Sequence, residues 1–295
     1  MFQNQPILVT GASSGIGKMV TDYLARSGHF VYACARKKSD IEHLNEIDNV
    51  ISFRLDVTNP SEVKQVVERV HTEGRGLYAI VNNAGVGESW PILATEEEML
   101  HRVFNINVYG PLRITNALMS FLIKSQGRIV NISSVAGLLT PIYMGSYSMS
   151  KYALESWSNA LLMELEPYNV KVSLIAPGNF STNITNAAIP ILVKRYHQAA
   201  ESMFQNDIEA MFAKIRERPD IWTSVPTPED VAEAVMDALF NENPKPRYLI
   251  ISQVETNLFT EVLRSQMIKI GQLFDENTHG ITKQDLHNML DDVIN

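Results

Sequence analysis

Short apolar runs alternate with amphipathic stretches along most of the chain. Seven of these runs are predicted to be strands, at residues 6–10, 30–35, 50–55, 78–81, 128–132, 172–176 and 247–251. Continuous apolar runs of this length are typical of strands that are buried on both faces. Helical spacing of apolar residues lies between them, over residues 18–27, 61–70, 96–124 and 146–166. The alternation predicts an α/β fold, a doubly wound parallel sheet of about seven strands.

Two later segments depart from the alternation. Residues from about 180 to 225 have a loosely amphipathic helical pattern with exposed apolar side chains, which is typical of a lid. Residues from about 255 to 295 are predicted to form a C-terminal extension of one or two helices. No Pro/Gly/Ser-rich linker or charge block divides the chain, so we expect residues 1–295 to form a single domain.

Composition narrows the possible functions. The net charge is −8 without a cluster of Lys and Arg, which makes nucleic acid an unfavourable partner. No apolar stretch approaches the eighteen residues of a membrane span, and the first residues lack the pattern of a signal peptide. Cys34 is the only cysteine and the seven histidines show no zinc-ligand spacing, so we expect a cytoplasmic protein without a metal.

A glycine turn follows the first predicted strand. Gly11, Gly15 and Gly17 lie between that strand and a helix, where free N–H groups and the helix dipole favour a phosphate. Residues 11–15 also match the nucleophile elbow of hydrolases around Ser13, but only one strand precedes them. A nucleotide-phosphate loop ending at Lys18 would require glycine at position 12 and a hydroxyl at position 19. A dinucleotide site is the favoured interpretation.

Tyr147 and Lys151 are four residues apart in the predicted helix 146–166, so both project from one face. An ammonium group beside a phenol favours the phenolate, and we expect Lys151 to lower the pKa of Tyr147 towards neutrality. The pair is therefore a candidate for proton transfer.

Further motifs occur in a fixed order along the chain. They are the glycine turn, Asn82-Asn83-Ala84-Gly85, Asn107, Ser134, Tyr147 with Lys151, and Pro177-Gly178. With this set the chain resembles the short-chain dehydrogenase/reductase family over residues 7–251. Residues 30–33, 178–182 and 244–248 are similar to the branch that holds 17β-hydroxysteroid and retinol dehydrogenases. The resemblance implies a Rossmann-like fold and an oxidoreductase that transfers a hydride between a nicotinamide cofactor and a carbonyl or alcohol.

The resemblance also assigns catalytic roles. Tyr147 is implied to be the general acid or base, and Lys151 to lower its pKa and bind the nicotinamide ribose. Ser134 is implied to donate to the substrate oxygen, with Ser133 as the alternative serine. Asn107 is expected to expose a backbone carbonyl that holds a water against Lys151. Such donors stabilise the charge that develops on the oxygen.

The cofactor contacts implied by the resemblance follow the edge of the sheet. They are Gly11, Ser13, Ser14, Gly15, Ile16, Gly17, Arg36, Asp56, Val57, Asn83, Ala84, Gly85, Tyr147, Lys151, Pro177, Gly178 and Thr182. Arg36 ends the second strand, where an arginine accepts a 2′-phosphate and a carboxylate would bind the free 2′-hydroxyl. We therefore expect NADP(H), with Ser14 as a second phosphate contact, and NAD(H) remains possible.

The substrate side of the predicted site is apolar. The residues expected there are Ser134, Leu138, Leu139, Tyr143, Met144, Tyr147, Met203 and Phe204. They indicate a lipophilic ketone or secondary alcohol, such as a steroid or a retinoid. Exposed apolar lid residues favour a subunit contact equally well, and the family commonly forms homodimers or homotetramers. A low-turnover NADP(H)-binding regulatory protein of the same fold is the alternative function.

Overall fold

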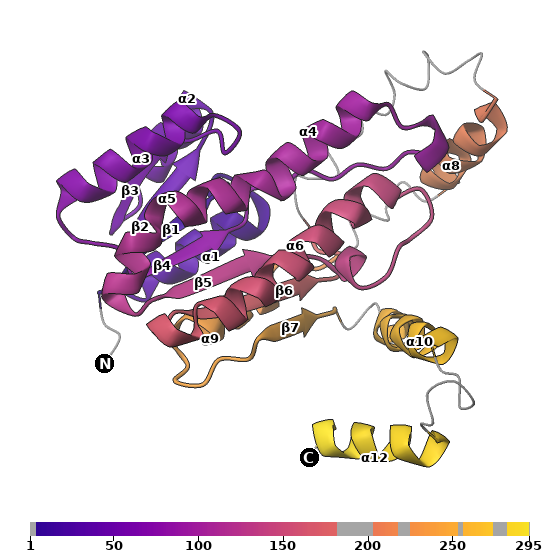
Figure 1. The fold of residues 1–295 in the computed structure, drawn as a ribbon. Helices are drawn as coiled ribbons and strands as arrows, with labels where there is room; N and C mark the ends of the chain where they lie inside the picture. Colours follow the sequence, from indigo (N-terminus) through magenta and orange to yellow (C-terminus); the bar gives the residue numbers. More distant parts are fainter. Residues whose placement is uncertain (1–3, 182–202, 218–224, 253–255, 274–281, 295) are drawn as a thin grey trace.

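Seven parallel strands form one sheet at the centre of the protein (Figure 1). The computed structural model describes residues 4–181, 203–217, 225–252, 256–273 and 282–294. The strands are β1 (Pro6–Thr10), β2 (Phe30–Ala35), β3 (Val50–Arg54), β4 (Ala79–Asn82), β5 (Arg128–Ile132), β6 (Lys171–Pro177) and β7 (Arg247–Ile250). Their order is β3-β2-β1-β4-β5-β6-β7. The order reverses between β1 and β4, which is where ligands bind in folds of this kind.

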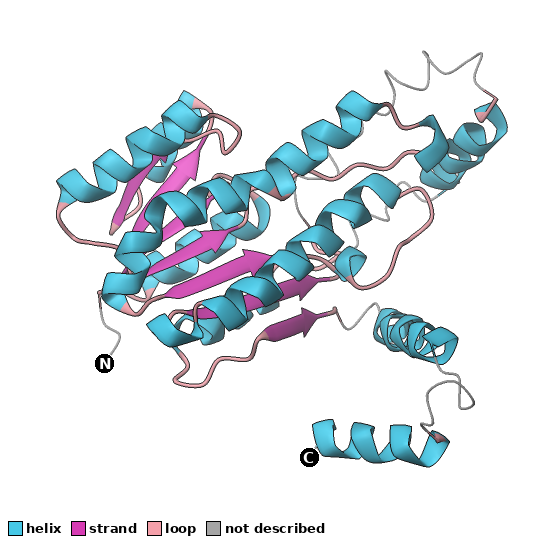
Figure 2. Cartoon of the chain, viewed as in Figure 1, coloured by secondary structure: helices cyan, strands magenta, loops and turns pink. Residues whose placement is uncertain are grey.

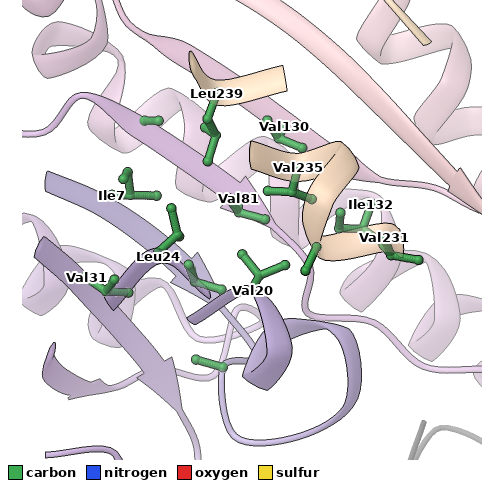
Figure 3. Close-up of a cluster of buried hydrophobic side chains, with 14 of the residues drawn as sticks. Ile7, Val20, Leu24, Val31, Val81, Val130, Ile132, Val231, Val235 and Leu239 are labelled. Atoms are coloured by element: carbon green, nitrogen blue, oxygen red, sulfur yellow. The ribbon is translucent and has the colours of Figure 1, made fainter. Parts of the chain in front are cut away.

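Helices cover both faces of the sheet. One face carries α1 (Gly15–Arg26), α2 (Lys38–Leu44) and α9 (Glu229–Phe240), and the other carries α3 (Pro60–Glu73), α5 (Tyr109–Ser125) and α6 (Gly145–Glu164). Alternate residues of a strand pack against the two helix layers. In β1, Ile7 and Val9 face the first layer and Leu8 faces the second. Figure 3 shows α1 and α9 packing their valines and leucines over the strands. Each such side chain stabilises the fold by about 1.5–3 kcal/mol.

The long helix predicted over residues 96–124 is two helices. α4 (Glu97–Asn107) ends where Val108 adopts φ −115° and ψ −61°, and α5 begins at the next residue. A β-carbon on Gly110 would lie 2.7 Å from Cγ2 of Val57, so the start of α5 packs closely on the loop after β3. The predicted interruption near Gly110 and Pro111 is confirmed, and it leaves Asn107 at the end of a helix.

Three outlying helices follow the later part of the chain: α8 (Gln205–Glu217), α10 (Thr256–Leu273) and α12 (Lys283–Ile294). α8 and α10 lie beyond the carboxyl ends of the strands (Figure 2). One or two helices were predicted beyond residue 255, and the structure has two there, α10 and α12, whereas residues 182–202 and 218–224 of the predicted lid lie outside the described residues. Across the described residues, no helix is both long and apolar enough to span a bilayer.

Candidate active site

The glycine turn lies between β1 and α1, at the point where the strand order reverses. Gly11 and Gly15 have φ of +66° and +53°, a region that glycine adopts without strain. A β-carbon on Gly17 would lie 2.2 Å from the Gly11 carbonyl oxygen, so only glycine fits there. Ser14 precedes α1 without capping it through its side chain, while Ser13 and Ile16 are half-buried. The first N–H groups of α1 have no partners within the helix and point into this turn.

Asn83 supports the glycine turn with its side chain. Its Nδ2 donates to the carbonyls of Thr10 (2.9 Å) and Gly11 (3.1 Å). The Thr10 hydroxyl in turn accepts from the backbone N–H groups of Asn83 and Ala84, each at 3.0 Å. The end of β4 is thereby fixed against the end of β1. The Asn83 amide serves the turn itself, which the motif alone did not reveal.

Arg36 follows β2 and is exposed beside the glycine turn. The backbone carbonyl of Arg36 accepts a hydrogen bond from the Arg54 guanidinium. The pKa of Asp56 is lowered against the effect of burial, mainly by hydrogen bonds from Thr58 and less by the positive charge of Arg36. Asp56 is itself committed to a turn, since its Oδ1 accepts from the Thr58 N–H (2.9 Å) and hydroxyl (2.7 Å). Val57 is buried under Gly110. These contacts leave the Arg36 side chain facing solvent at the edge where a 2′-phosphate is expected.

Tyr147 and Ser134 meet at the carboxyl end of β5. Tyr147 lies in the first turn of α6, and the Ser134 side chain is near enough to its phenol to act on the pKa of that phenol. Ser134 Oγ also accepts from the Ala136 N–H (3.1 Å) at the start of the short 3₁₀ helix η2 (Val135–Gly137). Ser133 is buried and its hydroxyl has no hydrogen-bond partner among the described residues. The structure thus brings Ser134, rather than Ser133, to the tyrosine.

Lys151 lies one turn after Tyr147 and is buried. Its Nζ donates to the Ile132 carbonyl (2.9 Å) and lies 5.6 Å from the centre of the Tyr147 ring. Burial lowers the pKa of Lys151 to about 8, although the negative charge of Glu155 acts in the opposite direction. Both residues occupy the same face, as their spacing predicts.

The predicted direction of the Tyr147 pKa is wrong. Burial raises the pKa of Tyr147 to about 12, and the hydrogen bond with Ser134 only partly opposes that rise. The physical reason is that desolvation penalises the phenolate, while the Lys151 ammonium is directed at the Ile132 carbonyl and makes no hydrogen bond to the phenol. At neutral pH the phenol is protonated.

Asn107 is buried at the end of α4 and binds the loop after β4. Its Oδ1 accepts from the Val86 N–H (2.9 Å), and its Nδ2 donates to the Val86 carbonyl (2.9 Å) and to the Ser150 hydroxyl (3.0 Å). A β-carbon on Gly85 would lie 3.4 Å from Asn107 Oδ1 and 4.0 Å from Lys151 Nζ, so these groups are neighbours. The side chain therefore holds the loop next to Lys151, and the predicted water on the Asn107 carbonyl stays a prediction.

Two of the residues predicted on the substrate side pack in one hydrophobic cluster. Tyr143 and Phe204 join a cluster with Trp90, Met99 and Ile208, which attaches α8 to the start of α4. Tyr143 has φ +65°, an unfavourable conformation for a non-glycine residue. Met203 is 89% exposed in the turn that precedes α8, so it does not pack with these apolar residues.

The loop after η2 is held by a helix that the motifs did not suggest. The Leu138 carbonyl accepts from Gln266 Nε2 and from Lys269 Nζ (3.2 Å), both on α10. Lys269 also donates to the Tyr152 hydroxyl (2.6 Å) on α6. Leu139 and Met144 are half-buried in the same loop. Contacts this distant in sequence leave no local signal, so sequence reasoning missed the role of α10.

The last predicted cofactor segment follows β6. Pro177 ends the strand and is buried, and the Gly178 N–H donates to the Ile250 carbonyl of β7 (2.8 Å). This bond fixes the backbone of the turn at the carboxyl edge of the sheet. Thr182 lies outside the described residues.

A family model described as short chain dehydrogenase matches residues 5–190, more than half of the chain. The chain belongs to this family. It is 39% identical over 208 residues to a 3-ketodihydrosphingosine reductase of Bacteroides thetaiotaomicron, covering 70% of this chain and 75% of that protein. It is 32% identical to an NADPH-dependent 3-dehydrocapnine reductase of Ornithobacterium rhinotracheale, covering 82% and 87%.

Other relatives agree with this assignment. The short-chain dehydrogenase is 30% identical to human retinol dehydrogenase 5, with 83% of this chain and 80% of that protein covered. A solved short-chain dehydrogenase from Streptomyces avermitilis superposes with a TM-score of 0.75 at 26% identity, covering 91% of this chain and 95% of the other. The predicted family, fold and NAD(P)-dependent oxidoreductase class are confirmed.

Proposed function

We propose that this short-chain dehydrogenase reduces the ketone of a lipophilic, long-chain substrate to a secondary alcohol, using NADP(H). The observation that carries the proposal is the meeting of a phenol, a serine hydroxyl and a buried lysine at the carboxyl end of β5. Tyr147, Ser134 and Lys151 are the proposed catalytic residues, with Asn107 holding the neighbouring loop.

The residues of the glycine turn fit a dinucleotide. Gly17 leaves no room for a side chain, so a ligand can approach the backbone of the turn and the N-terminus of α1. Exposed Arg36, with Ser14 nearby, suits the 2′-phosphate of NADP(H). Gly85, Gly178 and Lys151 lie along the same edge towards the proposed nicotinamide end. When bound, the cofactor would supply the hydride.

The protein's own part is to bind and protonate the carbonyl oxygen. Ser134 would donate a hydrogen bond to this oxygen, and Tyr147 would donate the proton that converts the forming alkoxide to an alcohol. The phenol carries its proton at neutral pH, as a proton donor must, and because its raised pKa makes it a weaker acid, the transfer would depend on positive charge beside it. Lys151 supplies positive charge behind the phenol, and the Asn107 side chain keeps the Val86 loop closed against it.

The proposed substrate class comes from the apolar surroundings and the relatives. Tyr143 and Phe204 lie in the cluster that joins α8 to α4, and Leu138 lies between the active-site loop and α10. Two of the relatives above are named as reductases of 3-oxo compounds, 3-ketodihydrosphingosine and 3-dehydrocapnine. We therefore favour a 3-oxo group on a long amphiphilic chain over a steroid or a retinoid.

Replacement of the proposed proton donor tests this function. Tyr147→Phe should lower kcat for NADPH-dependent reduction by about 10²–10⁴-fold, because general acid catalysis contributes on that order. The Kd for NADPH should change little, since the ring remains. Reduced-nicotinamide absorbance would be followed with 3-ketodihydrosphingosine, a retinal and a steroid ketone as substrates. Tyr152→Phe, on the same helix, is the control and should keep most of the activity.

Three outcomes contradict the proposal. Undiminished turnover in Tyr147→Phe would remove the tyrosine from the chemistry. Wild-type turnover confined to the steroid or the retinal would overturn the substrate class. NADPH binding without turnover on any substrate would favour the low-turnover binding protein.

A further inference from the structure

A buried acid lies behind the proposed catalytic lysine. Glu155 follows Lys151 by one helical turn of α6, so their side chains share a face. It is only 5% exposed, and its Oε1 has no hydrogen-bond partner among the described residues. An acidic side chain is almost never buried to this extent without a charged partner.

The partner comes from the other end of the chain. Arg247, at the start of β7, donates to Glu155 Oε2 through Nε (2.9 Å) and Nη2 (2.5 Å). Its Nη2 also lies 3.4 Å from Asn159 Oδ1, and its side chain is 37% exposed. Arg247 therefore holds one oxygen of the carboxylate from the solvent side and leaves the other oxygen facing the interior.

Glu155 also contacts the loop that carries the active-site serine. A β-carbon on Gly137 would lie 3.0 Å from Glu155 Cγ, 3.0 Å from Ser133 Oγ and 3.2 Å from the Lys151 carbonyl. The four residues are thus packed together where η2 crosses α6. Any change in the position of Glu155 is transmitted to the segment that begins at Ser134.

We propose that Glu155 is a positioning residue for Lys151, with Arg247 holding its carboxylate one helical turn from the lysine. A buried ammonium is costly unless an opposite charge lies nearby. Glu155 supplies that charge one turn away, which leaves Lys151 Nζ free to bond the Ile132 carbonyl and to face the proposed ribose site. Arg247 in turn holds the carboxylate in place through its two hydrogen bonds to Oε2.

Other charges near Lys151 do not take this role. The side chains nearest to it are uncharged, namely Tyr147 on the same helix, Asn107 at the end of α4 and Ser134 at the start of η2. Lys171, at the amino end of β6, donates to the Glu242 carbonyl. Two other elements pack on α6, namely α4 and the 3₁₀ helix η3 (Glu166–Tyr168). Their acidic and basic residues are exposed: Glu97, Glu98, His101, Arg102 and Glu166. Glu88, in the loop after β4, is also buried but pairs with Arg102 of α4 (3.3 Å), so Glu155 is the buried acid on the helix of Lys151 itself.

Glu155→Gln tests the inference directly, because it preserves shape and removes the charge. In protein labelled with 13Cε-lysine, the Lys151 signal, assigned by its loss in Lys151→Arg, reports the ionisation of this lysine. We expect its midpoint in Glu155→Gln to fall by about one pH unit below the wild-type value. Glu164→Gln, which removes one exposed negative charge from the same helix, should leave the midpoint unchanged. An unchanged midpoint in Glu155→Gln overturns the inference.

A second variant keeps the test valid if the first one does not fold. If Glu155→Gln unfolds because Arg247 loses its partner, Glu155→Gln with Arg247→Gln retains a neutral hydrogen-bonding pair. This double variant should show the same downward direction, and a midpoint at the wild-type value would again contradict the role of Glu155.

The kinetic readout rests on the proposed function, whereas the NMR titration does not. In NADPH-dependent reduction of 3-ketodihydrosphingosine, the alkaline limb of the kcat/KM profile should move down by the same pH interval, so that Glu155→Gln is roughly tenfold slower than wild type above that limb. A lysine shift without any wild-type turnover would refute the proposed function and leave the charge pairing intact. Turnover with unshifted profiles and an unshifted lysine would refute the pairing alone.

Discussion

The Gly17→Ala variant gives a sharp test of the cofactor turn. Its new β-carbon would lie 2.2 Å from the Gly11 carbonyl oxygen and 2.3 Å from Asn83 Nδ2. Ordinary contact begins at about 3.5 Å, so the two segments must separate by about 1 Å. Neither neighbour can rotate away freely, because the Gly11 carbonyl is backbone and Asn83 Nδ2 already donates to two carbonyls.

The magnitude follows from these contacts. Overpacking costs about 1–3 kcal/mol, and the better helix propensity of alanine returns about 1 kcal/mol, so the free energy of unfolding should fall by up to about 2 kcal/mol. A charge-assisted hydrogen bond lost between the turn and a cofactor phosphate is worth about 1.5–3 kcal/mol. The Kd for NADPH should therefore rise roughly ten- to hundredfold.

Titration calorimetry with NADPH and denaturant unfolding would measure both quantities. Gly271→Ala, in α10, is the matched control because no atom lies within 4 Å of its new β-carbon. It should leave the Kd unchanged and stabilise the protein by about 0.5–1 kcal/mol. If Gly17→Ala had the NADPH affinity and the stability of the wild type, the close contact between the end of β1 and the start of α1 would not form the cofactor site.

Two further predictions concern charges. In calorimetry, Arg36→Asp should raise the Kd for NADPH roughly ten- to hundredfold and leave the Kd for NADH nearly constant. The control Lys38→Ala changes an exposed residue two positions away and should alter neither Kd. An equal loss of affinity for both cofactors in Arg36→Asp would refute the assignment of Arg36. The pKa of Lys151 falls from its ordinary 10.5 to about 8 on folding, so the unfolded state binds more protons than the folded state between these two pH values. The free energy of unfolding should therefore rise between pH 8 and pH 10. The rise should be larger in the wild type than in Lys151→Met by up to about 3 kcal/mol. Parallel stability curves for these two proteins in urea would contradict the buried, shifted lysine.

Most of the sheet was predictable because its strands are buried on both faces. Continuous apolar runs therefore marked all seven strands to within two residues at either end. Helix α2 was missed, since its seven residues carry only Ile41 and Leu44 as apolar anchors among charged side chains. A helix of this length is defined by its packing against β2 and β3, which no local pattern records.

The site was predictable where its geometry follows from one element. Tyr147 and Lys151 share a helix, and the order of strands brings Ser134 to them. The hydrogen bonds of Asn83 and the approach of α10 to Leu138 join segments far apart in sequence, so they required the fold. The predicted direction of the Tyr147 pKa also required the fold, because desolvation of the phenol depends on all of the residues packed around it.

That wrong prediction changes how the proposed site works. The shifts of Tyr147 upwards and of Lys151 downwards both favour the neutral forms, as expected for two groups removed from water. A neutral phenol is already suited to give a proton, whereas a lysine is useful to it only while charged. The requirement falls on Lys151, whose pKa of about 8 leaves it mostly cationic at neutral pH because Glu155 opposes the effect of burial. In the proposed reduction the phenol already carries the proton that it gives, but its raised pKa makes it a weak acid, so the transfer depends on a charged Lys151 beside the phenolate that forms. The predicted effect of the lysine on the tyrosine therefore depends on what keeps the lysine itself charged.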